Sequence, residues 1–132
     1  MPRSVLIVDD EQHIRMLIEQ SLEELEDEGV ELITAGDGEA ALIEAERYRP
    51  DLIFLDIMMP KQNGFAVCRA IKHEIGLSES VVVMLTAKGQ VYDREQGVLA
   101  GADHYITKPF DPDELLEIAR GALQSPDGAP RP

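Results

Sequence analysis

The 132-residue chain contains no tryptophan, a single cysteine, and only three phenylalanines and three tyrosines. One cysteine excludes an internal disulfide framework and fits a reducing compartment, so we expect a cytoplasmic protein. Cys68 lies in an apolar helical stretch beside Val67 and Ala70, where a thiol is typically a small buried hydrophobe. The apolar run at residues 5–8 is far too short for a leader or a membrane span, and we expect neither.

Positive charge is also scarce, with 12 lysines and arginines against 26 acidic residues and a formal net charge of −14. Such a chain repels phosphates, so we expect no direct binding to nucleic acid or to an anionic membrane. The length indicates one domain with one core, which we place at residues 1–124. Residues 125–132 are polar and rich in proline and glycine, and are expected to form a disordered tail or linker stub.

The central feature is an apolar run at residues 52–55 that ends in Asp56. Its length and character predict a parallel strand buried on both faces. Short strand patterns then alternate with amphipathic helix patterns along the whole chain. Five strands separated by single helices predict a three-layer, doubly wound α/β domain with the flavodoxin-like order 2-1-3-4-5. The five predicted strands are residues 5–8, 30–35, 52–55, 81–85 and 104–107.

Polar side chains follow four of these strands at their carboxyl ends, namely Asp9 with Asp10, Asp56, Thr86 and Lys108. In the predicted order these ends share one crevice, where open α/β sheets bind their ligands. Close carboxylates raise one another's pKa values unless a cation joins them, and oxygen ligands without histidine or cysteine favour Mg²⁺. With a lysine and a hydroxyl for an anion, the pattern indicates phosphoryl transfer with Asp56 as the nucleophile.

Over about residues 4–123 the sequence resembles the receiver domains of two-component response regulators. The resemblance rests on several separated motifs, and their combination is far more specific than any one of them. They are residues 8–11, Asp56 with Pro60 and Gly64, Thr86 with Ala87, residues 101–103, and residues 108–110.

The resemblance implies that Asp56 accepts a phosphoryl group from a histidine kinase or a phosphotransfer protein. It implies that Asp10 and Asp56 bind Mg²⁺ directly, that Asp9 helps through water, and that the backbone carbonyl of Met58 completes the site. Such a domain is a phosphoacceptor that regulates a partner, with at most self-phosphorylation from small donors and slow self-dephosphorylation.

The resemblance also implies that Lys108 binds the acyl phosphate, that Thr86 moves toward it, and that Tyr105 turns inward behind it as the switch aromatic. A cis bond at Lys108–Pro109 is expected, because lysine reaches the phosphate only after a sharp turn. In related receivers the first helix contacts the kinase, and Ile14 and Met16 border the site here.

The face formed by the fourth helix, fifth strand and last helix commonly serves receivers as an output or dimer surface. His104 and Ile118 stand where charged residues usually form the dimer, so we expect a monomer or a weak, phosphorylation-dependent dimer. Glu95 lies between two apolar rows of the fourth helix, and burial of its carboxylate would be costly. One row must therefore be partly exposed, and we expect it to be that of Tyr92 and Leu99. The rows are Val91, Val98 and Ala102, and Tyr92 and Leu99.

Two other classes of protein share parts of this pattern. An aspartyl-phosphate hydrolase of small phosphoesters needs a second acid two residues after its nucleophile, and this chain has Met58 there. A flavin carrier needs a phosphate loop after the first strand and aromatic rings around the flavin. Residues 9–11 are acidic and would repel a flavin phosphate. We therefore retain the hydrolase as the alternative and exclude the flavin carrier.

Overall fold

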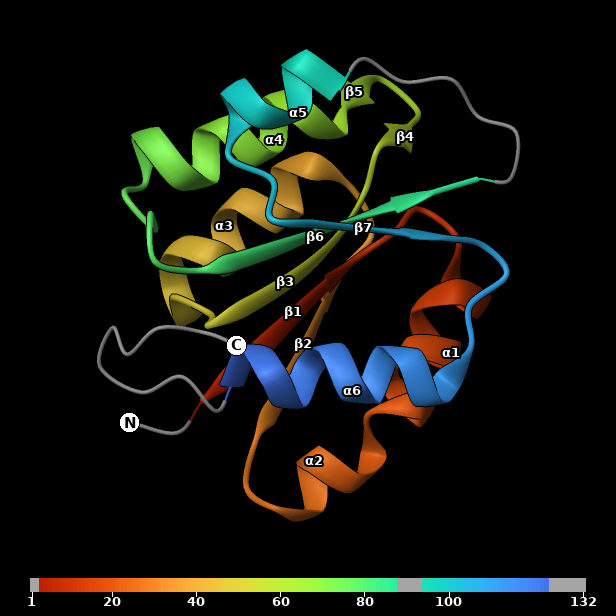
Figure 1. The fold of residues 1–132 in the computed structure, drawn as a ribbon. Helices are drawn as coiled ribbons and strands as arrows, with labels where there is room; N and C mark the ends of the chain where they lie inside the picture. The colour runs from red at the N-terminus through yellow and green to blue at the C-terminus, as the bar shows by residue number, and fades with distance from the viewer. Residues whose placement is uncertain (1–2, 88–93, 124–132) are drawn as a thin grey trace.

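The computed structural model describes residues 3–87 and 94–123. A five-stranded parallel sheet with the order β2-β1-β3-β6-β7 crosses the molecule (Figure 1), which confirms the predicted 2-1-3-4-5 order. The sheet strands are β1 (Ser4–Val8), β2 (Glu31–Ala35), β3 (Leu52–Asp56), β6 (Val81–Thr86) and β7 (His104–Thr107). The helices are α1 (Gln12–Ser21), α2 (Glu23–Asp27), α3 (Gly38–Tyr48), α4 (Gly64–Arg69), a π-helical segment (Ala70–Glu74), α5 (Arg94–Ala100) and α6 (Pro112–Leu123).

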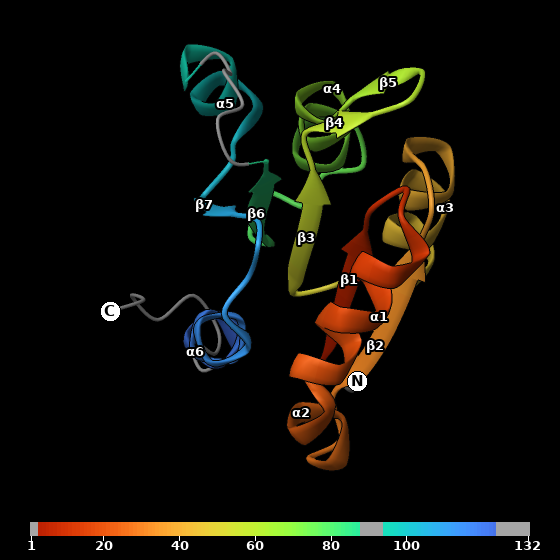
Figure 2. The ribbon, with the colours of Figure 1, turned by 90° about the vertical axis from the view of Figure 1, so that its right-hand side faces the viewer.

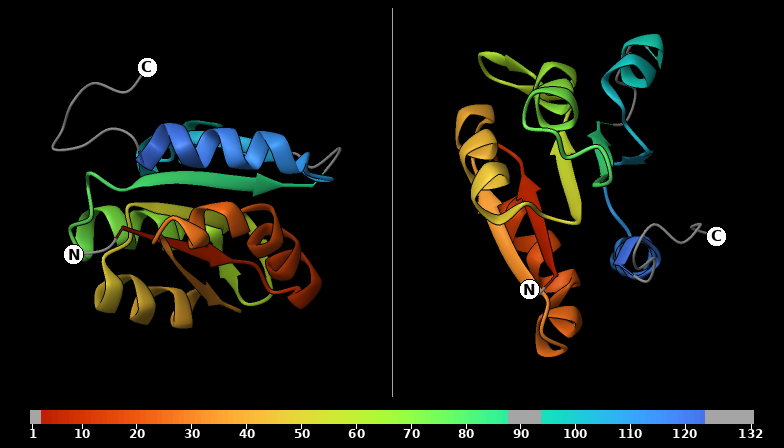
Figure 3. Two further views of the ribbon diagram at one scale, coloured as in Figure 1. Left: turned by 90° about the horizontal axis from the view of Figure 1, so that it is seen from below. Right: turned by 90° about the vertical axis from the view of Figure 1, so that its left-hand side faces the viewer.

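Helices cover both faces of the sheet, as Figures 2 and 3 show. The three inner strands are buried at every residue, while the edge strands β2 and β7 are partly exposed. This difference explains why the inner strands are continuous apolar runs in the sequence. On one face α1, α2 and α6 pack against side chains such as Phe54, and on the other α3, α4 and α5 pack against side chains such as Leu55.

Local sequence signals account for several helix ends. The Asp37 side chain accepts a hydrogen bond from the third residue beyond it at the start of α3, and the Asn63 side chain caps α4. Gly29 and Gly101 adopt positive φ angles of 97° and 94° after α2 and α5. The helical stretch after β1 is interrupted, because Leu22 leaves helical geometry and divides it into α1 and α2.

The turn after β3 is more ordered than the sequence indicated. Met58–Met59 (β4) and Gln62–Asn63 (β5) pair as a two-residue antiparallel hairpin around Lys61, whose φ is 71°. The hairpin leads directly from Asp56 into α4. Val91 and Tyr92, together with the predicted tail at 125–132, lie outside the described residues. Among the helices that are described, none is long and apolar enough to cross a membrane.

Candidate functional site

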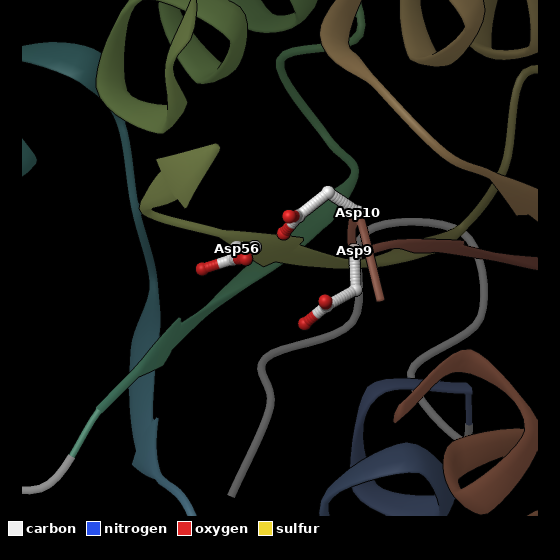
Figure 4. A group of neighbouring side chains, drawn as sticks. All are labelled: Asp9, Asp10 and Asp56. Atoms are coloured by element: carbon white, nitrogen blue, oxygen red, sulfur yellow. The ribbon is translucent and has the colours of Figure 1, made fainter. Parts of the chain in front are cut away.

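Three carboxylates meet at the carboxyl ends of β1 and β3. Asp9 and Asp10 follow β1, and Asp56 is the last residue of the adjacent β3. Figure 4 shows their side chains turning toward a common space, and one carboxylate oxygen of each lies within 4.8 Å of the others. Asp9 and Asp56 are buried, whereas Asp10 is exposed. The predicted cluster therefore forms, and it opens to solvent on the side of Asp10.

Lys108 reaches into this cluster from the turn after β7. Its ammonium nitrogen lies 2.9 Å from Asp9 Oδ2, 3.8 Å from Asp56 Oδ2 and 4.0 Å from Glu11 Oε1. The Lys108–Pro109 peptide bond is cis, as predicted. The backbone N–H of Lys108 donates to the carbonyl of Thr86 at 2.7 Å. This hydrogen bond ties the backbone of Lys108 to the end of β6, which lies next to β3.

The electrostatics of the cluster favour a proton on Asp56. Burial and the nearby Asp9 charge raise the pKa of Asp56 to about 7, against the opposing effects of Lys108 and of the Met58 N–H. That N–H donates to Asp56 Oδ1 at 3.1 Å. Burial disfavours the charged form of Lys108, but its carboxylate neighbours outweigh this and raise its pKa. Near neutral pH, a proton and a cation therefore compete for Asp56.

The donor atoms of the cluster fit a hard divalent cation. Asp9 Oδ1 accepts the N–H of Glu11 at 2.9 Å, but Asp9 Oδ2 is buried and makes no hydrogen bond of good geometry within the described residues. In the part of the chain that the structure describes, its one ion pair is with Lys108. Three carboxylates facing one ammonium leave negative charge that a cation would neutralise, and all their donors are oxygen. This is the ligand set that Mg²⁺ prefers.

The two predicted switch residues lie on neighbouring strands. The Thr86 hydroxyl is buried and lies 3.3 Å from the Ile106 carbonyl and 3.1 Å from Thr107 Oγ1, so β7 engages it. Tyr105 is 36% exposed, and its hydroxyl lies against Gly97 of α5, where a Cβ atom would overlap it. The sequence did not identify this contact, because Gly97 carries no side chain to form a pattern.

The exposure of α5 corrects one prediction. Leu99 is 66% exposed, as expected, and Glu95 is exposed as well, but Val98 of the other apolar row is 77% exposed. The helix is buried at Gly97 and Ala100, and the Ala100 carbonyl accepts a hydrogen bond from the buried Cys68 thiol. Packing through small residues leaves both large side chains outside. The part of the prediction that concerned Tyr92 lies outside the described residues.

A buried lysine at the opposite end of the sheet was missed. Lys72 is 7% exposed and donates to the carbonyls of Ser80 and Ser78 and to Asp103 Oδ2 at 3.1 Å. Asp103 also accepts the N–H of Val82 at 2.8 Å. Ser78 and Ser80 precede β6, and Asp103 precedes β7. Lys72 therefore joins the starts of these two strands, at the end of the sheet away from the carboxylates. The sequence signal was its place in the apolar stripe that includes Ile71.

Comparisons with known proteins agree with this geometry. The family model for the response regulator receiver domain matches residues 5–120. The chain is 44% identical over 124 residues to the alkaline phosphatase synthesis transcriptional regulatory protein PhoP of Bacillus subtilis, covering 94% of this chain and 50% of that one. It is 41% identical over 131 residues to the DNA-binding dual master transcriptional regulator RpaA of Synechocystis, covering 99% and 53%.

The fold of the chain is similar to that of a solved response regulator structure. The chemotaxis response regulator CheY4 of Vibrio cholerae superposes with a TM-score of 0.80 at 32% identity, covering 93% of this chain and 100% of that one. The chain spans about half the length of the curated relatives it matches.

Proposed function

The chain belongs to the response regulator receiver domain family of two-component signal transduction, and from this premise we propose that Asp56 is its phosphoacceptor. The phosphoryl group comes from a phosphohistidine on a histidine kinase or a phosphotransfer protein. The observation that carries the proposal is the convergence of Asp56 with Asp9, Asp10 and Lys108 at one end of the sheet. We assign residues 1–124 to the receiver domain and residues 125–132 to a tail or linker stub.

In the transfer step an Asp56 carboxylate oxygen attacks phosphorus while the bond from phosphorus to the imidazole nitrogen breaks. The leaving nitrogen takes up a proton, and the product is an acyl phosphate on Asp56. The ammonium of Lys108, already 3.8 Å from Asp56 Oδ2, binds the phosphoryl oxygens. Asp10, Asp56 and the Met58 carbonyl, with Asp9 acting through water, would hold Mg²⁺, which would supply positive charge to those oxygens.

Met58, two residues after Asp56, argues against the alternative of a phosphoester hydrolase. Met58 is 67% exposed and its side chain has no proton to give to an alkoxide leaving group. Phosphohistidine and acetyl phosphate have good leaving groups and need no such acid. The domain is therefore a regulatory phosphoacceptor rather than an enzyme acting on phosphoesters.

Phosphorylation acts on the output surface through Thr86 and Tyr105. To reach the phosphoryl group, the Thr86 hydroxyl exchanges its contacts with Ile106 and Thr107 for a phosphoryl oxygen. Tyr105 then turns inward and changes the position of α5. The affected surface is formed by α5, β7 and α6, and it binds a separate partner or a further domain of the kind that transcriptional regulators carry. The protein acts in the cytoplasm as a monomer or a weak phosphorylation-dependent dimer.

The kinase docks on α1, beside the mouth of the site. Met16 is 48% exposed, while Ile14 is half-buried against the core face that α6 also covers. Both residues lie in the helix that begins after Asp10. Met16 is therefore the more accessible of the two to a kinase.

Phosphoryl uptake from acetyl phosphate is the first test, and it is expected to require Mg²⁺. With the metal, intact-mass spectrometry should find one added phosphoryl group. When EDTA is added before acetyl phosphate, this product should not form. Because the folded pKa of Asp56 is about 7, protonation competes with the cation below that pH. Affinity for Mg²⁺ should fall up to about tenfold per pH unit below pH 6. Uptake that persists in EDTA would contradict the metal assignment.

The contact between Gly97 and Tyr105 gives a second prediction. In Gly97→Ala the new Cβ overlaps the Tyr105 hydroxyl and lies 3.2 Å from Phe65 Cε1, so the tyrosine ring must move. We expect shifted Tyr105 ring resonances and faster amide exchange in α5, with acetyl phosphate uptake retained. Adding Tyr105→Phe removes the overlapping oxygen but keeps Cζ 3.0 Å from the new Cβ, so it should return the exchange of α5 only part of the way to that of the parent.

Gly121→Ala in α6 is the matched control, since its Cβ meets no atom within 4 Å. Helix propensity alone should make that variant more stable by up to about 1 kcal/mol. Unchanged Tyr105 resonances in Gly97→Ala would show that the position of the Tyr105 ring does not depend on the absence of a side chain at residue 97.

A further inference from the structure

Arg15 lies in the first turn of α1 and extends its side chain back toward β1. Its Nη1 donates to the backbone carbonyl of Asp9 at 2.6 Å. The guanidinium also lies over Gly36 in the loop between β2 and α3, where a Cβ atom would be 3.3 Å from Nη1. Within residues 3–87 and 94–123, no carboxylate forms an ion pair with Arg15, although the chain has 26 acidic residues. Its charge is directed at one peptide group.

That peptide group joins Asp9 to Asp10. The Asp9 N–H donates to the carbonyl of Ala35 at 3.3 Å, and the Asp9 carboxylate pairs with Lys108, so Asp9 is fixed on the strand side. The peptide is planar, so an oxygen held by Arg15 also fixes the nitrogen and Cα of Asp10. Asp10 is exposed and lies at the open side of the cluster. The hydrogen bond from Arg15 therefore helps to set the backbone position from which the Asp10 carboxylate extends.

From this geometry we infer that Arg15 is a positioning residue for the divalent-cation site, which keeps the Asp10 carboxylate aimed at the space it shares with Asp56. The inference rests on the proposed function, because it takes the site to bind Mg²⁺. Groups that hold metal ligands in place typically change metal affinity by about 10- to 100-fold when they are removed.

The charge of Arg15 and its positioning role predict opposite changes in Mg²⁺ affinity when Arg15 is removed. A guanidinium hydrogen-bonded to the Asp9 carbonyl repels an incoming cation, so its removal should strengthen Mg²⁺ binding if only Coulomb energy matters. Removal weakens binding if the hydrogen bond to Asp9 positions Asp10. A measured loss of affinity can therefore be assigned to position and not to charge.

The test is Mg²⁺ affinity of the unphosphorylated chain, followed by calorimetry or by amide chemical shifts, since the chain has no tryptophan. Arg15→Met keeps the unbranched apolar stem of the side chain but loses the N–H donors of the guanidinium. This variant should bind Mg²⁺ at least about tenfold more weakly than the parent. Arg15→Lys keeps the charge and an N–H donor group, and its Mg²⁺ affinity should lie between those of the parent and Arg15→Met. Arg47→Met, which removes an exposed arginine on α3, is the charge control and should bind as the parent does.

Gly36→Ala perturbs the same contact without changing any charge or any proposed ligand. Its new Cβ displaces the guanidinium by a few tenths of an ångström, because the position allows an ordinary backbone but is tightly filled. We expect a several-fold loss of Mg²⁺ affinity with little change in melting temperature. This variant and Arg15→Lys decide the question if Arg15→Met fails to fold.

The outcomes separate the inference from the function on which it rests. Equal or tighter Mg²⁺ binding in Arg15→Met and Gly36→Ala, with normal binding by the parent chain, overturns the role of Arg15 alone. A parent chain that binds no Mg²⁺ at millimolar concentration overturns both the proposed metal site and the role of Arg15.

Discussion

Asp56→Asn is expected to abolish phosphoryl uptake from acetyl phosphate while it leaves the fold intact. The amide has no anionic oxygen to attack phosphorus, but it has nearly the same shape as the carboxylate. Asp56 is 4% exposed and close to Asp9, so a charge there is unfavourable in the absence of a cation. The variant should therefore be at least as stable as the parent chain at pH 8 without Mg²⁺.

The sign of that stability change follows from the pKa of Asp56. Its folded pKa, about 7, lies above the ordinary carboxyl value of 3.8, so ionisation of Asp56 lowers the stability of the metal-free fold as the pH rises through this range. The difference in melting temperature between Asp56→Asn and the parent should grow from pH 5 to pH 8 and shrink when Mg²⁺ is added. Asp27→Asn, an exposed change on α2, is the control and should show neither effect. A variant that still takes up the phosphoryl group excludes Asp56 as the acceptor.

Gly64→Ala is expected to cost about 3 kcal/mol of folding stability and most of the phosphoryl uptake. A Cβ atom on Gly64 overlaps the Asp56 carbonyl oxygen and lies 2.7 Å from Ile57 Cα. Both neighbours are backbone, so no side-chain rotation relieves the overlap. The Gly64 N–H also donates to the Ile57 carbonyl at 2.8 Å. Separation of α4 from β3 must therefore move Asp56 itself.

Denaturant unfolding and acetyl phosphate uptake measure the two effects of Gly64→Ala. Gly121→Ala, which meets open space, is again the control and should lose neither stability nor uptake. If Gly64→Ala unfolds at the same denaturant concentration as the parent, the close packing of α4 on the end of β3 does not hold in solution.

The sheet and the location of the site could be predicted from sequence because both depend on patterns along single strands. Inner strands of a parallel sheet are continuous apolar runs, and their order places Asp9, Asp56, Thr86 and Lys108 at one edge. These inferences need only the period of the hydrophobic pattern and the topology. The hairpin of β4 and β5 has two residues in each strand, which is too short for any period to appear.

Contacts of small or polar side chains across the fold could not be predicted in this way. We expected α5 to expose the row of Leu99 and to bury the row of Val98, but the helix packs through Gly97 and Ala100, and Val98 is exposed as well. The hydrogen bond from Arg15 to Asp9 joins a side chain to a backbone carbonyl, which no side-chain pattern reveals. Such contacts depend on how closely two elements approach each other. The sequence pattern indicates only which face of each element is apolar.

The most direct test of Asp56 as phosphoacceptor is to locate the phosphoryl group on the unmodified sequence. After acetyl phosphate and Mg²⁺, the acyl phosphate can be trapped with hydroxylamine, which converts the modified carboxyl to a hydroxamate, and tandem mass spectrometry of the peptides can then identify the residue. We expect a single modified residue, Asp56. Modification of Asp9 or Asp10 in its place, a phosphoryl group on a histidine, which leaves no hydroxamate, or one on a hydroxyl, which is stable to hydroxylamine, would contradict the assignment.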